Sequence, residues 1–247
     1  MSASEYFQID YDEKPNYFLN GFLALDAHEV KAMQVAVDFL TPAHNIEFGM
    51  AHPEFILDQE TGRLYMLEMN GRVGGGGVPA IDAQVYGISH LHLHLLALFD
   101  PTRFEKEFRN FPRPRKKMGF MFIVSSPGFG IWNPTAIRAI RSDPSYFLPG
   151  PQYEMIPESR VEPTVSMDTA QGMFYFVGDR AQVRRGVEKS MRMFEEGQLI
   201  DHTRIVDGGG SIAPQLCNAI LLNVSANRSR LVESMKNAAA KIDWRKF

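Results

Sequence analysis

The sequence predicts an α+β fold, because helix-like and strand-like stretches follow one another without the regular alternation that a parallel sheet needs. Apolar residues at helical spacing mark the helices, and alternating or continuous apolar runs between turn residues mark the strands. Helices are expected at 26–40, 81–98, 179–197 and about 227–241, and strands at 51–57, 63–70, 118–126 and 171–179, with short β-like runs around 151–167. The order is therefore helix, hairpin, helix, several strands and helix.

Capping residues support the boundaries of two helices. Asp26 with Glu29 three positions later is a capping box, in which each side chain accepts or donates at the first turn. Asp179 with Gln182 repeats this pattern before the helix at 179–197, and Gly197 is a plausible C-terminal stop. These two helices therefore begin at residues that the sequence itself marks.

Two segments between the expected elements are irregular. Residues 71–79 (GRVGGGGVP) hold too many glycines for a helix or strand. Residues 111–117 (FPRPRKK) combine two prolines with four basic residues, which indicates a solvated linker. The sequence thus predicts a loop after the hairpin and a connection before the second group of strands.

Composition excludes several classes of protein. The 247 residues carry 26 Lys+Arg and 29 Asp+Glu, and a formal net charge of −3 argues against a dedicated surface for nucleic acid or anionic membrane. No apolar run reaches the roughly 18 residues that a membrane span needs. One cysteine, Cys217, beside 13 methionines favours a cytoplasmic protein without disulfides, and its apolar surroundings favour a core position over a nucleophile.

The hairpin carries acidic residues in facing positions. A three-residue loop, Glu60-Thr61-Gly62 with Gly62 left-handed, is a common hairpin connection. The register that it sets pairs Gln59 with Arg63, Ile56 with Met66, Glu54 with Glu68 and His52 with Asn70. Since side chains alternate with period two, the last two pairs share one face, and Leu57 and Leu67 lie on the other.

Two carboxylates directly opposite each other repel, so something must offset the repulsion. A proton shared between Glu54 and Glu68 is one answer. A divalent cation is a better one, because the amide oxygen of Asn70 lies alongside, and oxygen ligands suit Mg²⁺ or Mn²⁺. Arg72, two residues further on, could hold a phosphate at the same site. A bare E…E-x-N pattern more often means acids facing solvent beside an idle glycine loop, but the full string is more specific.

The stretch from Gly49 to Gly77 resembles the metal-binding core of the ATP-grasp superfamily. The matching pattern is G-x-x-H-x-E-F, a short turn, then L-E-x-N-x-R and glycines. Biotin carboxylase, D-alanine–D-alanine ligase, carnosine synthase and bacterial L-amino acid ligases belong to this superfamily, and the H-x-E-F form is most similar to the last two. The specific resemblance covers about 30 residues and continues more loosely to about residue 200.

The resemblance implies an ATP-dependent carboxylate–amine ligase that acts on small-molecule substrates through an acyl phosphate. It implies that Glu54, Glu68 and Asn70 are the Mg²⁺ ligands. Arg72 matches the catalytic arginine that steadies the transferring phosphoryl group. Ile56 and Leu67 match positions that pack against adenine, although the expected register puts Leu67 on the opposite face unless a bulge intervenes. His52 would face the carboxyl substrate, and a last group would border the acceptor: Gly74, Gly75, Gly76 and Gly77.

The resemblance also implies the division of the chain. Residues 1–110 correspond to the C-terminal lobe of the catalytic domain, 118–200 to a β-rich C-terminal subdomain, and 201–247 to a helical tail. The fold expected is therefore α+β, the C-terminal portion of an ATP-grasp fold, with an antiparallel sheet, flanking helices and a strand-rich subdomain.

The nucleotide-binding lysines and glycine-rich flap of the superfamily lie well upstream of the metal acids. Only 53 residues precede Glu54, and neither Lys14 nor Lys31 has a phosphate-binding context. The chain therefore looks like the C-terminal half of such an enzyme. It could be one chain of a split enzyme whose second chain supplies the N-terminal lobe, a truncated remnant, or a non-catalytic binding module.

Other motifs are less informative. His90, His92 and His94 would share a face on a strand, but the surrounding apolar spacing is helical, which favours ordinary helix histidines. The sequence contains none of the P-loop, H-E-x-x-H or G-x-S-x-G motifs. The common P-loop hydrolases, zinc proteases and α/β-hydrolases therefore have no motif to support them.

Overall fold

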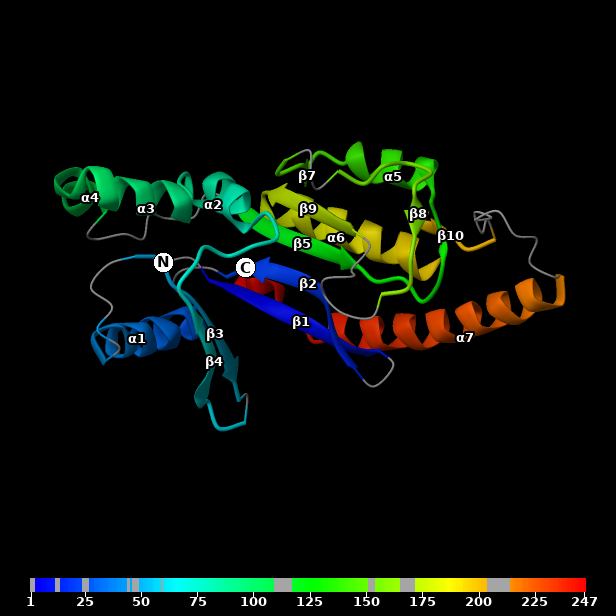
Figure 1. Cartoon of the computed structure of the whole chain (residues 1–247), viewed down its shortest axis with the longest axis horizontal. Coiled ribbons are helices and arrows are strands. Elements are labelled where there is room, and N and C mark those ends of the chain that lie inside the picture. The colour runs from blue at the N-terminus through cyan, green and yellow to red at the C-terminus, as the bar shows by residue number, and fades with distance from the viewer. Residues whose placement is uncertain are drawn as a thin grey trace. The chain divides into compact units, whose positions relative to one another are not determined.

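The computed structural model describes most of the chain (Figure 1). The described residues are 3–11, 14–23, 27–43, 45, 49–58, 60–108, 117–150, 154–164, 172–203 and 214–247, with side chains left aside at 8–17 and 214–225. Two compact units divide the chain. Unit 1 comprises Met1–Ser4, Phe22–Met118 and Lys246–Phe247, and unit 2 comprises Glu5–Gly21 and Gly119–Arg245.

Unit 1 contains helices and one two-stranded antiparallel sheet. Its elements in chain order are α1 (His28–Ala43), β3 (His52–Leu57), β4 (Leu64–Asn70), α2 (Val78–Tyr86), α3 (His90–Phe99) and α4 (Pro101–Phe108). The helix expected at 26–40 and both hairpin strands are confirmed. Asp26 of the expected capping box lies outside the described residues, as does most of the expected linker at 111–117.

The single helix expected over 81–98 is wrong, because the structure has two helices there. Gly87 ends α2 with a φ of 80°, a left-handed conformation that glycine adopts at little cost. Ser89 then caps α3 by accepting a hydrogen bond from the backbone N–H of His92 at 3.1 Å. These two local signals outweigh the continuous apolar spacing.

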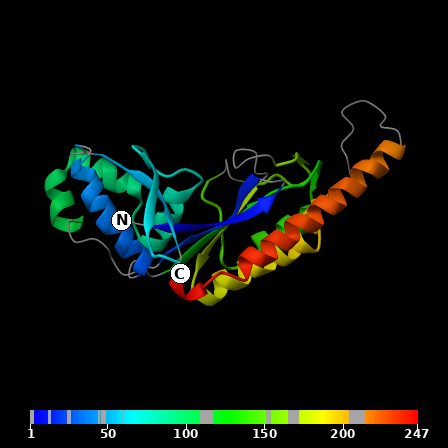
Figure 2. The same ribbon diagram turned by 90° about the horizontal axis from the view of Figure 1, so that it is seen from below.

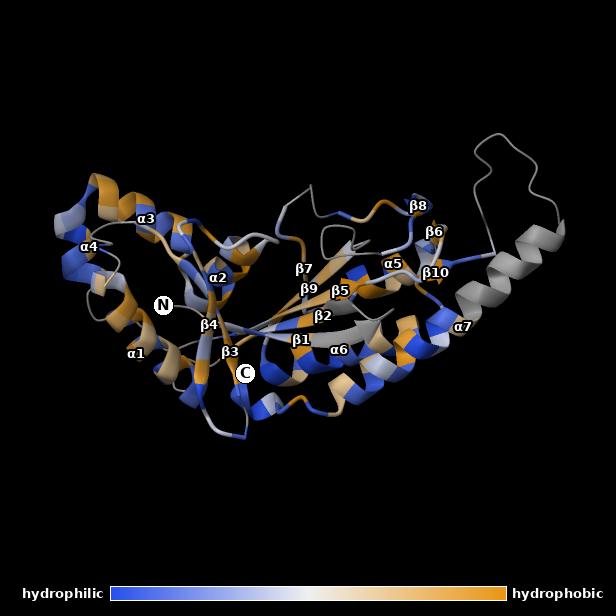
Figure 3. Ribbon diagram, turned by 60° about the horizontal axis from the view of Figure 1, so that its bottom comes forward, coloured by the Kyte–Doolittle hydropathy of each residue, from blue (hydrophilic) through white to orange (hydrophobic). Residues whose placement is uncertain are grey.

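The break also changes which face α3 presents. Leu91, Leu95 and Leu98, expected on a buried face continuous with α2, are 45% to 48% exposed. No residue of α3 is buried, and Figure 3 shows the strongly hydrophobic colouring along this helix. By contrast, Ile81 and Val85 of α2 are fully buried. Burial in unit 1 is therefore carried by α2 rather than by α3.

Unit 2 is built on a five-stranded sheet of order β1-β2-β5-β9-β7. Its strands are β1 (Ser4–Tyr11), β2 (Lys14–Phe22), β5 (Met118–Val124), β7 (Tyr146–Phe147) and β9 (Gly172–Gly178), and a second sheet of order β10-β6-β8 joins β6 (Gly130–Trp132), β8 (Arg160–Val161) and β10 (Ile200–Asp201). Its helices are α5 (Pro134–Arg141), α6 (Arg180–Glu195) and α7 (Pro214–Ala239), followed by a short 3₁₀ helix, η3 (Trp244–Lys246), which ends in unit 1. The strands expected at 118–126 and 171–179 are confirmed, as is the Asp179–Gln182 capping box of α6.

The helices α6 and α7 lie side by side on one face of this sheet (Figure 2). Phe120 and Phe122 are two residues apart on β5 and therefore point to the same face. The ring of Phe122 is 6.4 Å from that of Phe194 on α6, and the ring of Phe120 is 5.1 Å from that of Trp244, which follows α7. All seven residues of β5 are buried, so the core of unit 2 is centred on this strand.

The helix α6 approaches β9 most closely at Gly186. A Cβ atom at this position would lie 2.7 Å from the ring of Phe176 and 2.7 Å from Oγ of Ser145. We expect Gly186→Ala to lower the free energy of unfolding by about 1–3 kcal/mol, because packed interiors accommodate added atoms only by strain. Urea denaturation measures this change. The exposed neighbour Arg185 provides the control, since Arg185→Ala should alter stability by less than about 0.5 kcal/mol. A more stable Gly186→Ala protein would show that the neighbouring ring yields.

The two units differ from the ranges expected from sequence. The division near residue 118 agrees, but residues 5–21 lie in unit 2, and so does most of the segment 201–247. The last helix begins at Pro214 rather than near 227. Within the described stretches, no helix combines the length and apolarity that crossing a membrane requires.

Candidate functional site

The β3–β4 hairpin brings four of the predicted site residues into two facing pairs. His52 lies opposite Asn70, and Glu54 lies opposite Glu68, which confirms the predicted pairing. Because alternate residues of a strand point to the same face, all four side chains belong to one face of the hairpin. The pairs lie at the end of the hairpin that is remote from its turn.

The turn itself is one residue longer than expected. The backbone N–H of Asp58 donates to the carbonyl oxygen of Arg63 at 2.8 Å, and the N–H of Gly62 donates to the carbonyl oxygen of Asp58 at 2.8 Å. Four residues, not three, therefore separate the facing residues Asp58 and Arg63. The expected partner of Arg63, Gln59, lies outside the described residues. Gly62 adopts a φ of 67°, which confirms its predicted left-handed conformation.

A bulge in β4 compensates for the longer turn. The register shifts between Glu54 and Phe55, so that Leu67 has no residue opposite it. The expected pair of Ile56 with Met66 is therefore wrong, and Ile56 lies opposite Tyr65 instead. The extra turn residue and the bulge each displace the register by one residue in opposite directions. Their effects cancel at the two acids.

Each acid has a polar neighbour on its own strand. The amide nitrogen Nδ2 of Asn70 donates a hydrogen bond to Oε1 of Glu68. Nε2 of His52 lies 4.0 Å from Oε1 of Glu54, and their side chains are 27% and 31% exposed. Nδ1 of His52 is buried without a hydrogen-bond partner. The neighbours lessen the repulsion between the two carboxylates without joining the two strands through side chains.

The donor set fits a magnesium ion in kind. Two carboxylates and one amide are oxygen ligands, and Mg²⁺ usually takes one or two carboxylates and completes its shell with water and phosphate oxygens. Rotation of the Asn70 amide by 180° would present its oxygen in place of its nitrogen. In the part of the chain that the structure describes, no three His, Cys, Asp or Glu side chains are grouped closely enough to hold a metal ion by themselves. Ligands from outside the protein would have to complete the shell.

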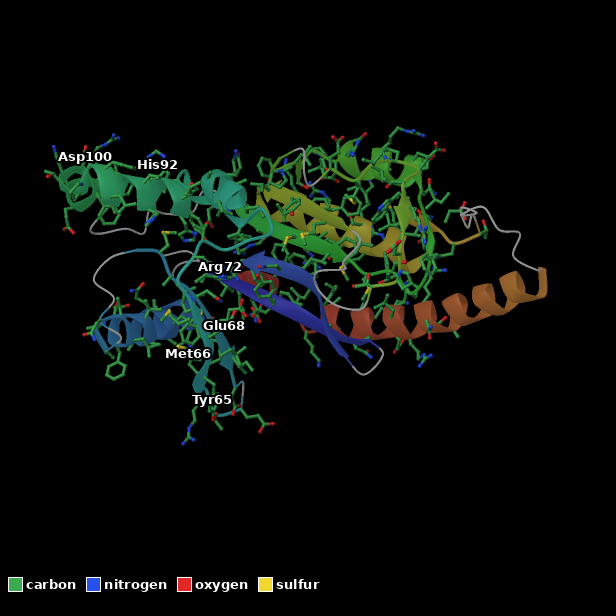
Figure 4. The ribbon with its side chains drawn as sticks, viewed as in Figure 1. Tyr65, Met66, Glu68, Arg72, His92 and Asp100 are labelled. Atoms are coloured by element: carbon green, nitrogen blue, oxygen red, sulfur yellow. The ribbon has the colours of Figure 1, made fainter. Side chains whose placement is uncertain are left out.

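Apolar side chains follow the acids toward the turn. Ile56 and Leu67, the two expected adenine contacts, are 52% and 58% exposed. Tyr65 and Met66, which the sequence did not single out, are 50% and 41% exposed. Figure 4 shows Arg72, Glu68, Met66 and Tyr65 in succession from the base of the hairpin toward its tip. The hairpin therefore presents a polar base and an accessible apolar strip.

The glycine loop lies beside the polar base. A Cβ atom at Gly74 would be 3.9 Å from Cε1 of His52 and 3.5 Å from Cγ1 of Val78. Gly76 and Gly77 adopt φ values of 61° and 79°, in the left-handed region that favours glycine. The loop passes directly into α2, where Gly77 is the N-cap residue. The structure thus brings His52 and the loop together, as two parts of the predicted substrate region.

Arg72 lies between the acids and the glycine loop. Its Nη1 donates to the carbonyl oxygen of Val73 at 3.2 Å, and the residue is exposed. A guanidinium has five N–H donors in a fork that matches phosphate oxygens. The exposed guanidinium group can therefore meet an anionic ligand at the base of the hairpin.

Asp58 organises the turn through hydrogen bonds. Its Oδ1 accepts from the backbone N–H groups of Glu60 at 2.9 Å and Thr61 at 3.1 Å. Hydrogen bonds from the Thr61 side chain and these N–H groups lower the pKa of the Asp58 carboxyl below its ordinary value of 3.8. The folded state therefore binds this proton less readily than the unfolded state does.

We expect this hairpin turn to weaken in acid. With a lowered pKa, the contribution of Asp58 to stability is present above about pH 3.8 and is lost as the pH falls through the folded-state pKa. Asp58→Asn should make the turn amides exchange faster at pH 5–7, and the difference from the unaltered protein should vanish in acid. Amide hydrogen exchange of the amide of Gly62 measures this. An equal difference at every pH would contradict the role of the charge.

The structure also reveals an ion pair that the sequence did not predict. Nδ1 of His90 lies 2.6 Å from Oδ2 of Asp82, whose side chain is 2% exposed. The three histidines at 90, 92 and 94 do lie on a helix, which confirms the helical interpretation, and Figure 4 shows His92 on α3. A polar residue inside the apolar stretch of α2 was the signal that could have pointed to Asp82. Cys217 lies on α7, and its side chain is outside what the structure describes.

Comparison with known proteins supplies a fold but no sequence relative. No family model matches the sequence, and no curated protein matches it either. The structure is similar to phosphoribosylglycinamide synthetase from Anaerococcus prevotii, with a TM-score of 0.55 and 13% identity, over 77% of this chain and 47% of that one. It is also similar to L-amino acid ligase from Bacillus licheniformis, with a TM-score of 0.51 and 18% identity, over 76% of this chain and 52% of that one.

The chain therefore spans about half the length of these two solved structures. Identities below 20% carry no information on substrate, so the likeness concerns the course of the backbone alone. It agrees with the mixture of helices and antiparallel sheets described above. Over the part that it shares with these two enzymes, the chain has the fold of the ATP-grasp superfamily.

Proposed function

We propose that this chain is the C-terminal half of an ATP- and Mg²⁺-dependent carboxylate–amine ligase that acts through an acyl phosphate. The observation that carries the proposal is the pairing of Glu54 with Glu68 and of His52 with Asn70 on one face of the β3–β4 hairpin. This arrangement occurs in a fold shared with two solved ligases. Neither a solvent-facing hairpin nor a glycine linker requires these pairs to coincide.

In this proposal the polar base of the hairpin holds the metal and the phosphates. Glu54, Glu68 and the Asn70 amide would bind Mg²⁺ or Mn²⁺, which neutralises phosphate charge when bound. Arg72 would contact the γ-phosphoryl group as it is transferred, because charge develops on its oxygens there. The exposed guanidinium and the two facing carboxylates support these roles.

The organic ligands would lie on either side of this base. Ile56 and Leu67 would pack against adenine, and the bulge at Leu67 supports this role, because it removes Leu67 from the regular alternation that would turn it away. His52 would face the carboxylate substrate. Gly74, Gly75 and Gly76 would border the amine acceptor, and the approach of His52 to Gly74 supports a shared substrate region.

The proposed reaction has two steps. A carboxylate oxygen of the substrate attacks the γ-phosphorus, the bond from that phosphorus to the bridging oxygen breaks, and ADP leaves. The nitrogen of an amine then attacks the carbonyl carbon, the bond to the phosphate oxygen breaks, and inorganic phosphate leaves while the nitrogen loses a proton. Both steps depend mainly on orientation and charge neutralisation. We place this reaction in the cytoplasm, on the evidence of the single cysteine.

A second proposal is a non-catalytic subunit that keeps the fold without the nucleotide-binding lobe. It is favoured by the observation that the chain spans about half of the solved ligases that it resembles. In the ligase proposal, the residues that complete the nucleotide site would come from sequence outside these 247 residues, in the same polypeptide or on a second chain. The two proposals thus differ in whether the hairpin contacts nucleotide.

Thermal unfolding of the purified chain with and without Mg²⁺ and a non-hydrolysable ATP analogue separates the proposals. A ligand at about 100 times its dissociation constant adds about 2.7 kcal/mol, which raises the midpoint of a chain of this size by about 5–10 °C. We expect a rise that requires both metal and nucleotide. A cooperative transition that millimolar nucleotide does not move would contradict binding by this half alone and favour the second proposal.

A further inference from the structure

We propose that the Asp82–His90 ion pair is a positioning element for the glycine loop, Gly74–Gly77. The pair joins α2 to α3, and α2 begins directly after the loop. The inference deepens the proposed function, on which it rests in one respect: the loop is the part of the site assigned to the acceptor. The geometry of the pair and of the loop is independent of that assignment.

The pair is directional and buried at its acidic end. Nδ1 of His90 lies 2.6 Å from Oδ2 of Asp82, and the side chains are 26% and 2% exposed. Beyond this ion-pair contact, neither oxygen of Asp82 has a hydrogen-bond partner in the described part of the chain. A buried carboxylate is costly unless it is paired. The separation of α2 from α3 is therefore tied to this one contact.

Packing connects the pair to the loop. Val78 is one helical turn before Asp82 on α2, so the two side chains project from the same side of the helix. The side chain of Val78 comes within 3.5 Å of the position that a Cβ of Gly74 would occupy. The N–H of Val78 donates to the carbonyl oxygen of Gly75 at 3.1 Å, and that of Ile81 donates to the carbonyl oxygen of Gly77 at 3.2 Å.

The loop in turn borders the candidate site. His52 lies 3.9 Å from the Cβ position of Gly74, and the same imidazole lies 4.0 Å from Glu54. A loop of four glycines has many accessible conformations, and a fixed first turn of α2 selects among them. A directional ion pair specifies the arrangement of two helices more narrowly than apolar contact does. Asp82 and His90 are positioning residues in this view, since neither contacts the acids.

Amide hydrogen exchange of the full chain, without nucleotide, tests the proposal. The reporters are the amides of Val78, Ala80 and Ile81, which all donate to carbonyl oxygens of the loop. We expect Asp82→Asn and His90→Gln to speed exchange at these amides by tenfold or more, while the hairpin amides Asp58 and Gly62 keep their rates. The exchanged double variant, Asp82→His with His90→Asp, should restore the slow exchange.

The matched control is the exposed pair of Arg103 and Glu107 on α4, whose atoms are 3.0 Å apart. Glu107→Gln removes one charge from the same unit and should leave the reporters unchanged. Unchanged reporters in both single variants would overturn the proposal, and so would equal acceleration throughout unit 1, which indicates a general loss of stability. If the single variants do not fold, an exchanged double variant that folds with slow reporters supports the proposal, and one that folds with fast reporters overturns it. None of these results depends on nucleotide binding, so the proposed function is tested separately.

Discussion

Glu68→Ala is expected to abolish the stabilisation of this chain by Mg²⁺ and a non-hydrolysable ATP analogue. The carboxylate lies opposite Glu54 on the hairpin and is exposed to a ligand. Its loss removes one of the two charges that would hold the metal, and with the metal goes the bridge to the phosphates. The rise in unfolding midpoint, about 5–10 °C for the unaltered chain at saturating ligand, should fall to nearly zero.

Without ligand, the same variant should be at least as stable as the unaltered chain, because facing like charges destabilise a sheet. Glu60→Ala supplies the matched control. Glu60 is an exposed glutamate in the turn of the same hairpin, away from the paired acids. It should keep the full ligand-dependent rise. Equal rises in Glu68→Ala and Glu60→Ala would show that the facing acids do not bind the metal.

Phe122→Ala should give the largest loss of stability among the substitutions considered. Phe122 on β5 is fully buried, and its ring centroid lies 6.4 Å from those of both Phe174 and Phe194. Truncation removes the apolar surface and leaves a cavity between β9 and α6, which costs about 3–5 kcal/mol. The midpoint of thermal unfolding should fall by about 6–20 °C. Calorimetry or circular dichroism measures this fall.

Phe129→Ala provides the matched comparison within unit 2. Phe129 is 40% exposed, and the guanidinium of Arg160 lies 4.9 Å from its ring centroid. Loss of this contact at an exposed position should cost only about 0.5–1 kcal/mol. A similar cost for both phenylalanines would contradict the placement of the unit 2 core along β5.

The candidate site shows how local and distant effects divide. The facing acids could be predicted because a left-handed Gly62 and period-two alternation are local properties of the hairpin. The predicted turn was nevertheless one residue too short, because the hydrogen bonds of Asp58 extend it. The bulge at Leu67 restores the pairing of the acids. No short pattern shows such a bulge, since it depends on how the two strands twist and pack.

The helices after the glycine loop show the limit of apolar periodicity. Spacing alone favours one helix over 81–98, whereas Gly87 and Ser89 divide it into α2 and α3. These residues are local signals, and capping rules would have found them. The ion pair of Asp82 with His90 is different, because eight residues and a change of helix separate its members. Only the packing of one helix beside the other brings them together.

The sequence by itself determined the α+β class, the strands β5 and β9, the capped helix α6 and the pairing of Glu54 with Glu68, all of which depend on residues a few positions apart. The tertiary structure alone decided that β1 and β2 join the sheet of β5 and β9, because pairing between segments about 100 residues apart leaves no short-range pattern. It also decided that Asp82 is buried against His90, since burial of a charge follows from which elements pack around it.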